Sequence, residues 1–134
     1  MEYIEIPKST EERKIFLKKE LQKFNGISKM CPAINKTVHI DSNSIKETIN
    51  NASITWQSTR LALMLPELIE NGRTLVNYDK PESNSQVKTF NFNRVYIIYS
   101  EIENLGIAKL VIGRTHYGKY IHYSVTAIKI YTAR

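Results

Sequence analysis

The feature that most constrains the fold of this chain is a predicted β-hairpin from Gly106 to Tyr131. Its turn is expected at His116-Tyr117-Gly118-Lys119, because Gly118 can adopt the positive φ that a tight turn needs. Residues with high strand propensity flank this turn on both sides. A turn with two central residues therefore predicts one register for the two strands.

That register divides the hairpin into a polar and an apolar face, because successive strand residues point to opposite sides. The expected pairs are His122 with Gly113, Ser124 with Val111, and Thr126 with Lys109. The polar face then carries Tyr120, His122, Ser124 and Thr126. The apolar face carries Leu110, Ile112, Ile121, Tyr123 and Val125. We expect the apolar face to pack against helices and the polar face to carry the function.

Helical patterns precede the hairpin. A capping box of Ser9 and Glu12 opens a predicted helix over residues 9–24, and a second box of Ser44 and Glu47 lies at the start of another helix. Shorter helices are expected over residues 56–64 and 66–70, and strands over 37–40, 73–78, 89–100, 106–115 and 119–131. This order predicts an α+β fold, with N-terminal helices packed on one face of a C-terminal antiparallel β-sheet, a meander of about four strands.

The 134 residues carry a formal net charge of +6, and the positive excess lies in the second half of the chain. Nine Lys and Arg residues against four Asp and Glu follow Gly72, whereas residues 1–72 hold ten against nine. The excess favours a polyanionic partner such as RNA, DNA or an acidic protein. A domain with surplus solvated lysines is the alternative that charge alone leaves open.

The number of cysteines and the spacing of the histidines bear on whether the chain holds a disulfide or a metal ion. Cys31 is the only cysteine, which excludes an internal disulfide and a cysteine-ligated zinc site. The three histidines lack metal-ligand spacing, so we expect no metal and no cofactor. No apolar run is long enough to cross a bilayer, and the N-terminus does not resemble a signal peptide. These features predict a cytoplasmic protein without membrane contact.

Two segments and the closing meander carry a resemblance to a known family. They are Val38-His39-Ile40-Asp41-Ser42-Asn43-Ser44-Ile45-Lys46-Glu47-Thr48 and Leu63-Met64-Leu65-Pro66-Glu67-Leu68-Ile69-Glu70-Asn71. The stretch from Val38 to Ile130 resembles a domain of large polyvalent proteins from phages and conjugative elements, which is similar to the barnase–RelE-like endoribonuclease superfamily. Length predicts one domain over residues 1–134. The resemblance divides it into an N-terminal helical extension, 1–36, and a nuclease-like core, 37–134.

Related phage nuclease-like domains place a histidine near the start of the helix after the first strand. The matching positions here are Lys46, Glu47 and Thr48, and the nearest histidine, His39, lies on the strand before. Lys46 and Thr48 would join the site if this helix packs along the edge of the sheet. The general base of the family is therefore either replaced or lost in this chain.

RNA cleavage without metal needs a base for the ribose 2′-hydroxyl, an acid for the leaving oxygen, and cations or hydrogen-bond donors around the phosphate. Histidine suits proton transfer near neutral pH, and lysine and arginine suit phosphate binding. The candidate catalytic residues are His122, Ser124, Lys46 and Thr48. The candidate substrate-binding residues are Lys109, Arg114, Tyr120 and Thr126. The structural alternatives are a surface histidine at position 122 and an ordinary strand tyrosine at position 120.

We therefore expect an RNase-like domain of mobile-element origin, a hydrolase or toxin of the endoribonuclease type, that binds RNA on the polar sheet face. Whether it also cleaves RNA is left open. The alternative is a catalytically inactive interaction module, for example a phage-encoded anti-defence inhibitor that binds a host nucleoprotein complex.

Overall fold

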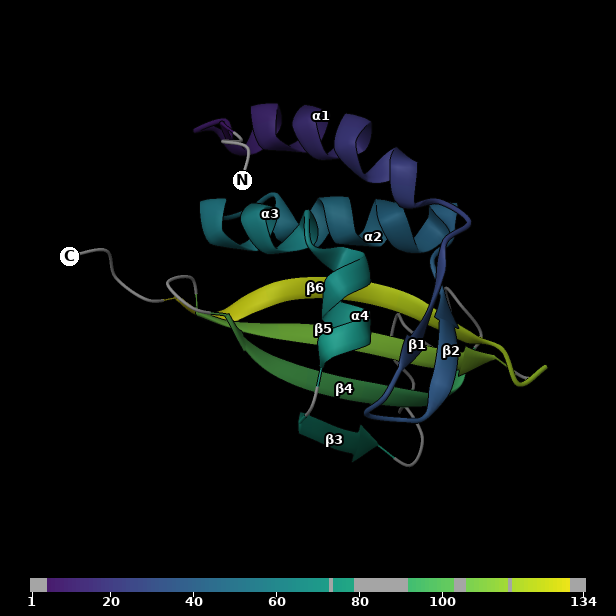
Figure 1. The fold of residues 1–134 in the computed structure, drawn as a ribbon. Coiled ribbons are helices and arrows are strands. Elements are labelled where there is room, and N and C mark those ends of the chain that lie inside the picture. Colours follow the sequence, from purple (N-terminus) through teal and green to yellow (C-terminus); the bar gives the residue numbers. More distant parts are fainter. Residues whose placement is uncertain (1–4, 73, 79–91, 103–105, 116, 131–134) are drawn as a thin grey trace.

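The structure is a computed structural model that describes residues 5–72, 74–78, 92–102, 106–115 and 117–130. Its helices are α1 (Thr10–Leu21), the short 3-10 helix η1 (Gln22–Phe24), α2 (Ser42–Ala52), α3 (Trp56–Ala62) and α4 (Leu65–Asn71). Its strands are β1 (Ser28–Cys31), β2 (Lys36–His39), β3 (Thr74–Tyr78), β4 (Phe92–Ile102), β5 (Gly106–Thr115) and β6 (Tyr120–Ile130). Helices α2 and α3 lie over one face of a single sheet, and α1 forms a further layer outside them (Figure 1). The predicted α+β class is confirmed.

The helix starts follow the capping chemistry of the sequence. The Ser9 hydroxyl accepts a hydrogen bond from the Glu12 backbone N–H at 3.1 Å, as the first capping box predicts. The second helix begins earlier than its predicted box. Its N-cap is Asp41, whose carboxylate accepts from the backbone N–H of Ser44 at 2.9 Å. Asp41 and Ser44 form a reciprocal capping box, in which Ser44 is the third helical residue.

Over the described ranges, the sheet has six strands in the order β1-β2-β6-β5-β4-β3. The four strands from β3 to β6 form the predicted antiparallel meander. The prediction of a purely antiparallel sheet is wrong, because β2 pairs with β6 in parallel, Val38 with Tyr120 and His39 with Ile121. Parallel neighbours need a long connection between them. Here that connection comprises three helices and the rest of the meander, so no local pattern in the sequence indicates the pairing.

The turn of the β5–β6 hairpin is one residue longer than predicted. The Thr115 backbone N–H donates to the Lys119 carbonyl at 2.9 Å, which leaves three residues in the loop. Gly118 has a φ of 80°, the left-handed conformation that closes a three-residue loop. A β-bulge then shifts the register between Val111 and Ile112, so that Tyr123 on β6 has no residue opposite it. Beyond the bulge the pairs Val111–Ser124 and Lys109–Thr126 match the prediction.

Because of the longer turn and the bulge, the part of β6 between them points its side chains to the faces opposite to those predicted. Leu110, Ile112 and Val125 are buried in the cluster that the helices cover, as predicted. His122 is fully buried in the protein and contacts α2, so its predicted place on a polar, open face is wrong. Ile121 and Tyr123 are buried as predicted, but they belong to a second apolar cluster on the opposite face of the sheet.

An arginine connects α1 to the layer beneath it. The guanidinium of Arg13 is buried and donates to the carbonyls of Ser53 at 2.7 Å and Ile54 at 3.0 Å, at the junction between α2 and α3. Leu17 and Leu21 on the same helix are fully buried in the core. The predicted N-terminal extension is thus fastened to the sheet-covering helices by both a polar and an apolar contact.

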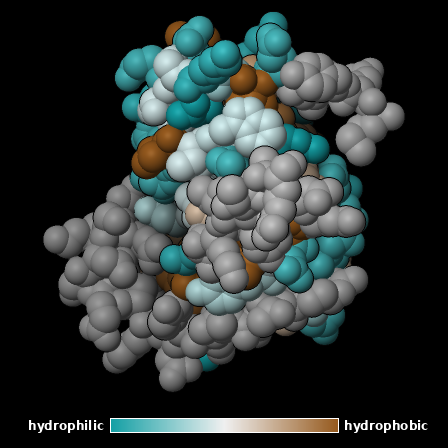
Figure 2. Space-filling view, turned by 90° about the vertical axis from the view of Figure 1, so that its left-hand side faces the viewer, coloured by the Kyte–Doolittle hydropathy of each residue, from teal (hydrophilic) through white to brown (hydrophobic). Residues whose placement is uncertain are grey.

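The outer surface on this side is mainly hydrophilic. Figure 2 shows teal side chains dominating the top of the molecule, where α1 lies, with brown hydrophobic atoms in separate small patches. Among the described residues of this region, Ile15 is 72% exposed, Ile54 64% and Trp56 42%. Exposed apolar residues of this kind are ordinary when they are scattered, so they define no docking surface by themselves.

Candidate functional site

The predicted catalytic residues do not form one site. Thr48 on α2 and His122 on β6 do meet, because α2 packs against β6, and Thr48 Oγ1 lies 2.8 Å from His122 Nε2. Both residues are 0% exposed. Lys46 is two positions from Thr48, and residues with that spacing do not share a helix face. Lys46 is therefore exposed, and it lines a separate groove of about 250 Å³ between α1 and α2.

The buried position of His122 removes its expected chemistry. Desolvation lowers the pKa of His122 to about 3, so the imidazole is neutral at physiological pH. Its Nδ1 atom is buried and has no hydrogen-bond partner among the described residues. A general base must come within hydrogen-bond reach of the proton that it removes. His122 is covered by α2, and its contact with Thr48 is a polar contact within the core.

His39, the next candidate base, also has a structural contact. Its Nδ1 atom lies 2.6 Å from the Ser28 hydroxyl, its cross-strand neighbour on β1. This contact joins the two strands of the β1–β2 hairpin. His116, in the predicted turn, lies outside the described residues.

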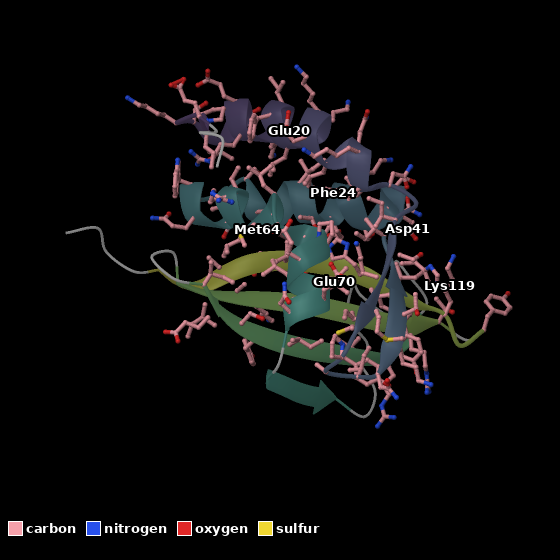
Figure 3. All side chains as sticks on the ribbon, in the orientation of Figure 1. Glu20, Phe24, Asp41, Met64, Glu70 and Lys119 are labelled. Carbon is pink, nitrogen blue, oxygen red and sulfur yellow. The ribbon has the colours of Figure 1, made fainter. Side chains whose placement is uncertain are left out.

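Two predicted substrate-binding residues, Arg114 and Tyr120, lie in a group that we call the basic–aromatic cluster. Its members are Lys36, Arg94, Tyr96, Arg114 and Tyr120. Arg94 pairs with Arg114 across β4 and β5, and Arg114 pairs with Tyr120 across β5 and β6. The cluster lies at the end of the sheet that carries the β5–β6 turn, the end marked by Lys119 in Figure 3.

Cations and aromatic rings are interleaved in this cluster. The Tyr96 and Tyr120 rings lie 5.8 Å apart, the Lys36 ammonium lies 5.9 Å from the Tyr120 ring, and the Arg94 guanidinium lies 5.6 Å from the Tyr96 ring. Each cation–ring distance is within the range of a cation–π interaction. Burial raises the pKa of Tyr96, and Tyr120 adds to the increase, while Arg94 and Arg114 oppose it. The cluster is a local concentration of positive charge on a rigid aromatic support.

Sequence reasoning missed three of the five cluster residues. Arg94 and Tyr96 carry a signal that was available, because alternation places them on one face of β4 opposite the predicted Arg114. Lys36 carries no such signal. It reaches Tyr120 only because β2 lies beside β6, which is the parallel pairing that the sequence does not indicate.

The remaining predicted residues, Lys109, Ser124 and Thr126, gather on the opposite face of the sheet. They line a hollow of about 460 Å³ that we call the β6-edge hollow. Its other described lining residues are Glu47, Asn51, Ile54, Val111 and Tyr123. Ser124 was expected to be open, but it is only 7% exposed, because it lies at the inner side of the hollow. The bulge at Tyr123 thus separates the predicted site into two regions.

No group of three His, Cys, Asp or Glu side chains within the described ranges could hold a metal ion. In the same ranges, no helix is long and apolar enough to span a membrane. Comparison of the chain with protein-family models, with curated proteins and with solved structures gives no match. The resemblance to phage nuclease-like domains therefore stays a prediction from the sequence.

Proposed function

We propose that this protein is an RNA-binding module that holds the RNA backbone at the basic–aromatic cluster and does not cleave it. The observation that carries the proposal is the convergence of Lys36, Arg94 and Arg114 on the ring pair of Tyr96 and Tyr120. Proteins bind RNA by combining cationic side chains for phosphates with aromatic rings.

The charges of the cluster favour an anion over a neutral partner. Arg94 and Arg114 are directly opposite each other on adjacent strands, so their side chains are close enough to contact one ligand group together. Their planar guanidinium groups suit phosphate oxygens. Both arginines are half-buried, which strengthens their attraction for an anion relative to fully solvated lysines.

The absence of cleavage in this proposal rests on the environment of His122. A neutral imidazole beneath α2 cannot exchange protons with a bound ribose, and Ser124 lies on the other side of the sheet from the basic–aromatic cluster. The family's catalytic base is thus interpreted as lost rather than relocated. The proposal is thus the first of the two functions that the sequence left open, an RNase-like domain that binds RNA, without the cleavage step.

A titration with fluorescently labelled single-stranded RNA tests the proposal. The double variant Arg94→Gln/Arg114→Gln should bind more weakly, and its slope of log K against log salt should be lower by about 1.4, or about 0.7 per lost contact. The matched control is Lys18→Gln/Lys19→Gln, which removes the same charge from the exposed face of α1. Equal losses in both double variants would contradict the proposal, because the charge would then act diffusely.

Two further outcomes separate the proposal from its competitors. Incubation with total RNA in EDTA should leave the RNA intact, and cleavage that persists in purified protein would return the chain to the endoribonuclease hypothesis. Absence of RNA binding alongside tight binding to one host nucleoprotein complex would favour the anti-defence hypothesis.

A further inference from the structure

The β6-edge hollow is a second region, which the proposed RNA-binding function does not use. It forms where β6 loses its neighbour, because β2 pairs with β6 only at Tyr120 and Ile121. Beyond that point α2 and α3 lie along the edge instead. Their contacts with it include the Thr48–His122 pair and a hydrogen bond of 2.9 Å from the Ala127 backbone N–H to the Ser58 hydroxyl. Between these two contacts the edge opens into the hollow.

Two side chains of opposite charge, from different elements, line the hollow. Glu47 comes from α2 and Lys109 from β5, and both side chains are half-buried. From the residues that the structure describes, the Glu47 carboxylate accepts only a long hydrogen bond, from the Asn51 amide at 3.4 Å. Within the described part of the chain, Lys109 has no ion-pair partner. The hollow therefore holds one negative and one positive group that do not neutralise each other.

Hydroxyl and aliphatic groups complete the lining. Thr126 is the cross-strand neighbour of Lys109, and Ser124 is the cross-strand neighbour of Val111. Side chains of such neighbours are close enough to contact one ligand group together. The Ser124 and Thr126 hydroxyls can therefore donate to an anion held by Lys109. Ile54 adds aliphatic surface to a lining that is otherwise mainly polar.

We propose that the β6-edge hollow binds a small zwitterion, a free α-amino acid. The ligand ammonium pairs with Glu47, and its carboxylate pairs with Lys109 and the hydroxyl of Thr126. The volume of about 460 Å³ lies within the range of small-molecule sites and exceeds the need of one amino acid. A simple anion would face the Glu47 carboxylate, and a neutral sugar would leave both charges unpaired.

Ligand titrations of the full, ¹⁵N-labelled chain test this site by nuclear magnetic resonance. Leucine should shift the backbone amide signals of Ser124 and Thr126 and the side-chain amide of Asn51. N-acetylleucine lacks the ammonium and leucinamide lacks the carboxylate, so each should bind at least about tenfold more weakly, the equivalent of one charge-assisted hydrogen bond. Equal shifts with all three compounds would overturn the proposal, and so would no shift with leucine or phenylalanine.

Variants of the two charged residues give a second, independent measurement. Lys109→Met and Glu47→Gln should each weaken leucine binding by about tenfold or more. Lys19→Met and Glu67→Gln are the matched controls, because both residues are exposed and lie outside the hollow; they should leave binding unchanged. The folded state of each variant is checked from its amide spectrum. Unweakened binding in folded Lys109→Met would place the ligand elsewhere and exclude this site.

Discussion

The basic–aromatic cluster and the β6-edge hollow both draw on the β5–β6 hairpin, yet they lie on opposite faces of the sheet. Arg114 in the cluster and Lys109 in the hollow are five residues apart on β5, about 16 Å along an extended strand. The cluster combines three cationic side chains with two aromatic rings, whereas the hollow combines one positive and one negative group with hydroxyls. The comparison shows that one bulge residue can divide a single polar stripe of sequence into two surfaces of different charge and composition.

The largest expected effect is a loss of folding stability, which tests which face of β5 packs against the helices. Ile112→Ala removes a fully buried side chain from the helix-facing core and should lower the free energy of unfolding by about 2–5 kcal/mol. Lys109→Ala, on the opposite face of the same strand, should change it by less than about 0.5 kcal/mol. Denaturant unfolding of the two variants measures the difference. Similar losses from both substitutions would mean that β5 does not present one face to the helices.

The next effect concerns the pH dependence of folding. Because the folded pKa of His122 is about 3 and the usual value is 6.5, the unfolded chain binds the proton more readily between these values. Stability from the neutral imidazole is present above pH 6.5 and is lost as the pH falls towards 3. The loss from this residue should reach about 2 kcal/mol at pH 5.

Denaturant unfolding at pH 8 and at pH 5 measures this loss, with His122→Gln as the variant that cannot titrate. Carboxylates contribute the same background in both proteins, so the difference between the two pH slopes isolates His122. Identical slopes would show that His122 is solvated, which would reopen its catalytic role.

The smallest effect compares the two regions as RNA-binding surfaces. Arg114→Gln should weaken binding of single-stranded RNA by about tenfold, the loss of one charge-assisted contact. Lys109→Gln removes the same charge from the other face and should change RNA affinity by less than about twofold at 0.15 M salt, where the Debye length is about 8 Å. Anisotropy titrations at this salt concentration measure both. A larger loss from Lys109→Gln would place the RNA at the hollow.

Local sequence signals predicted most elements of the fold. The Ser9 capping box, the strand over residues 106–115 and the order of the meander strands are as expected, since each depends on residues a few positions apart. The strand β1 was missed, because residues 28–31 show no clear alternation and pair only with their neighbour β2. Of the five residues of the basic–aromatic cluster, the sequence predicted only Arg114 and Tyr120, and it did not predict which residues lie beside them.

The sequence by itself determined which residues have the chemistry for binding: the positive excess after Gly72, the hydroxyls of β6 and the alternation that makes β5 two-faced. Only the tertiary structure decided which of these residues meet. The three-residue loop and the bulge at Tyr123 exchange the faces of Tyr120 and His122, and a one-residue change of register always has this effect in a strand. The contacts of His122 with Thr48, 74 positions away, and of Tyr120 with Lys36 depend on helix packing and a parallel pairing. Such non-local contacts arise from the packing of the whole core, which no short segment of sequence specifies.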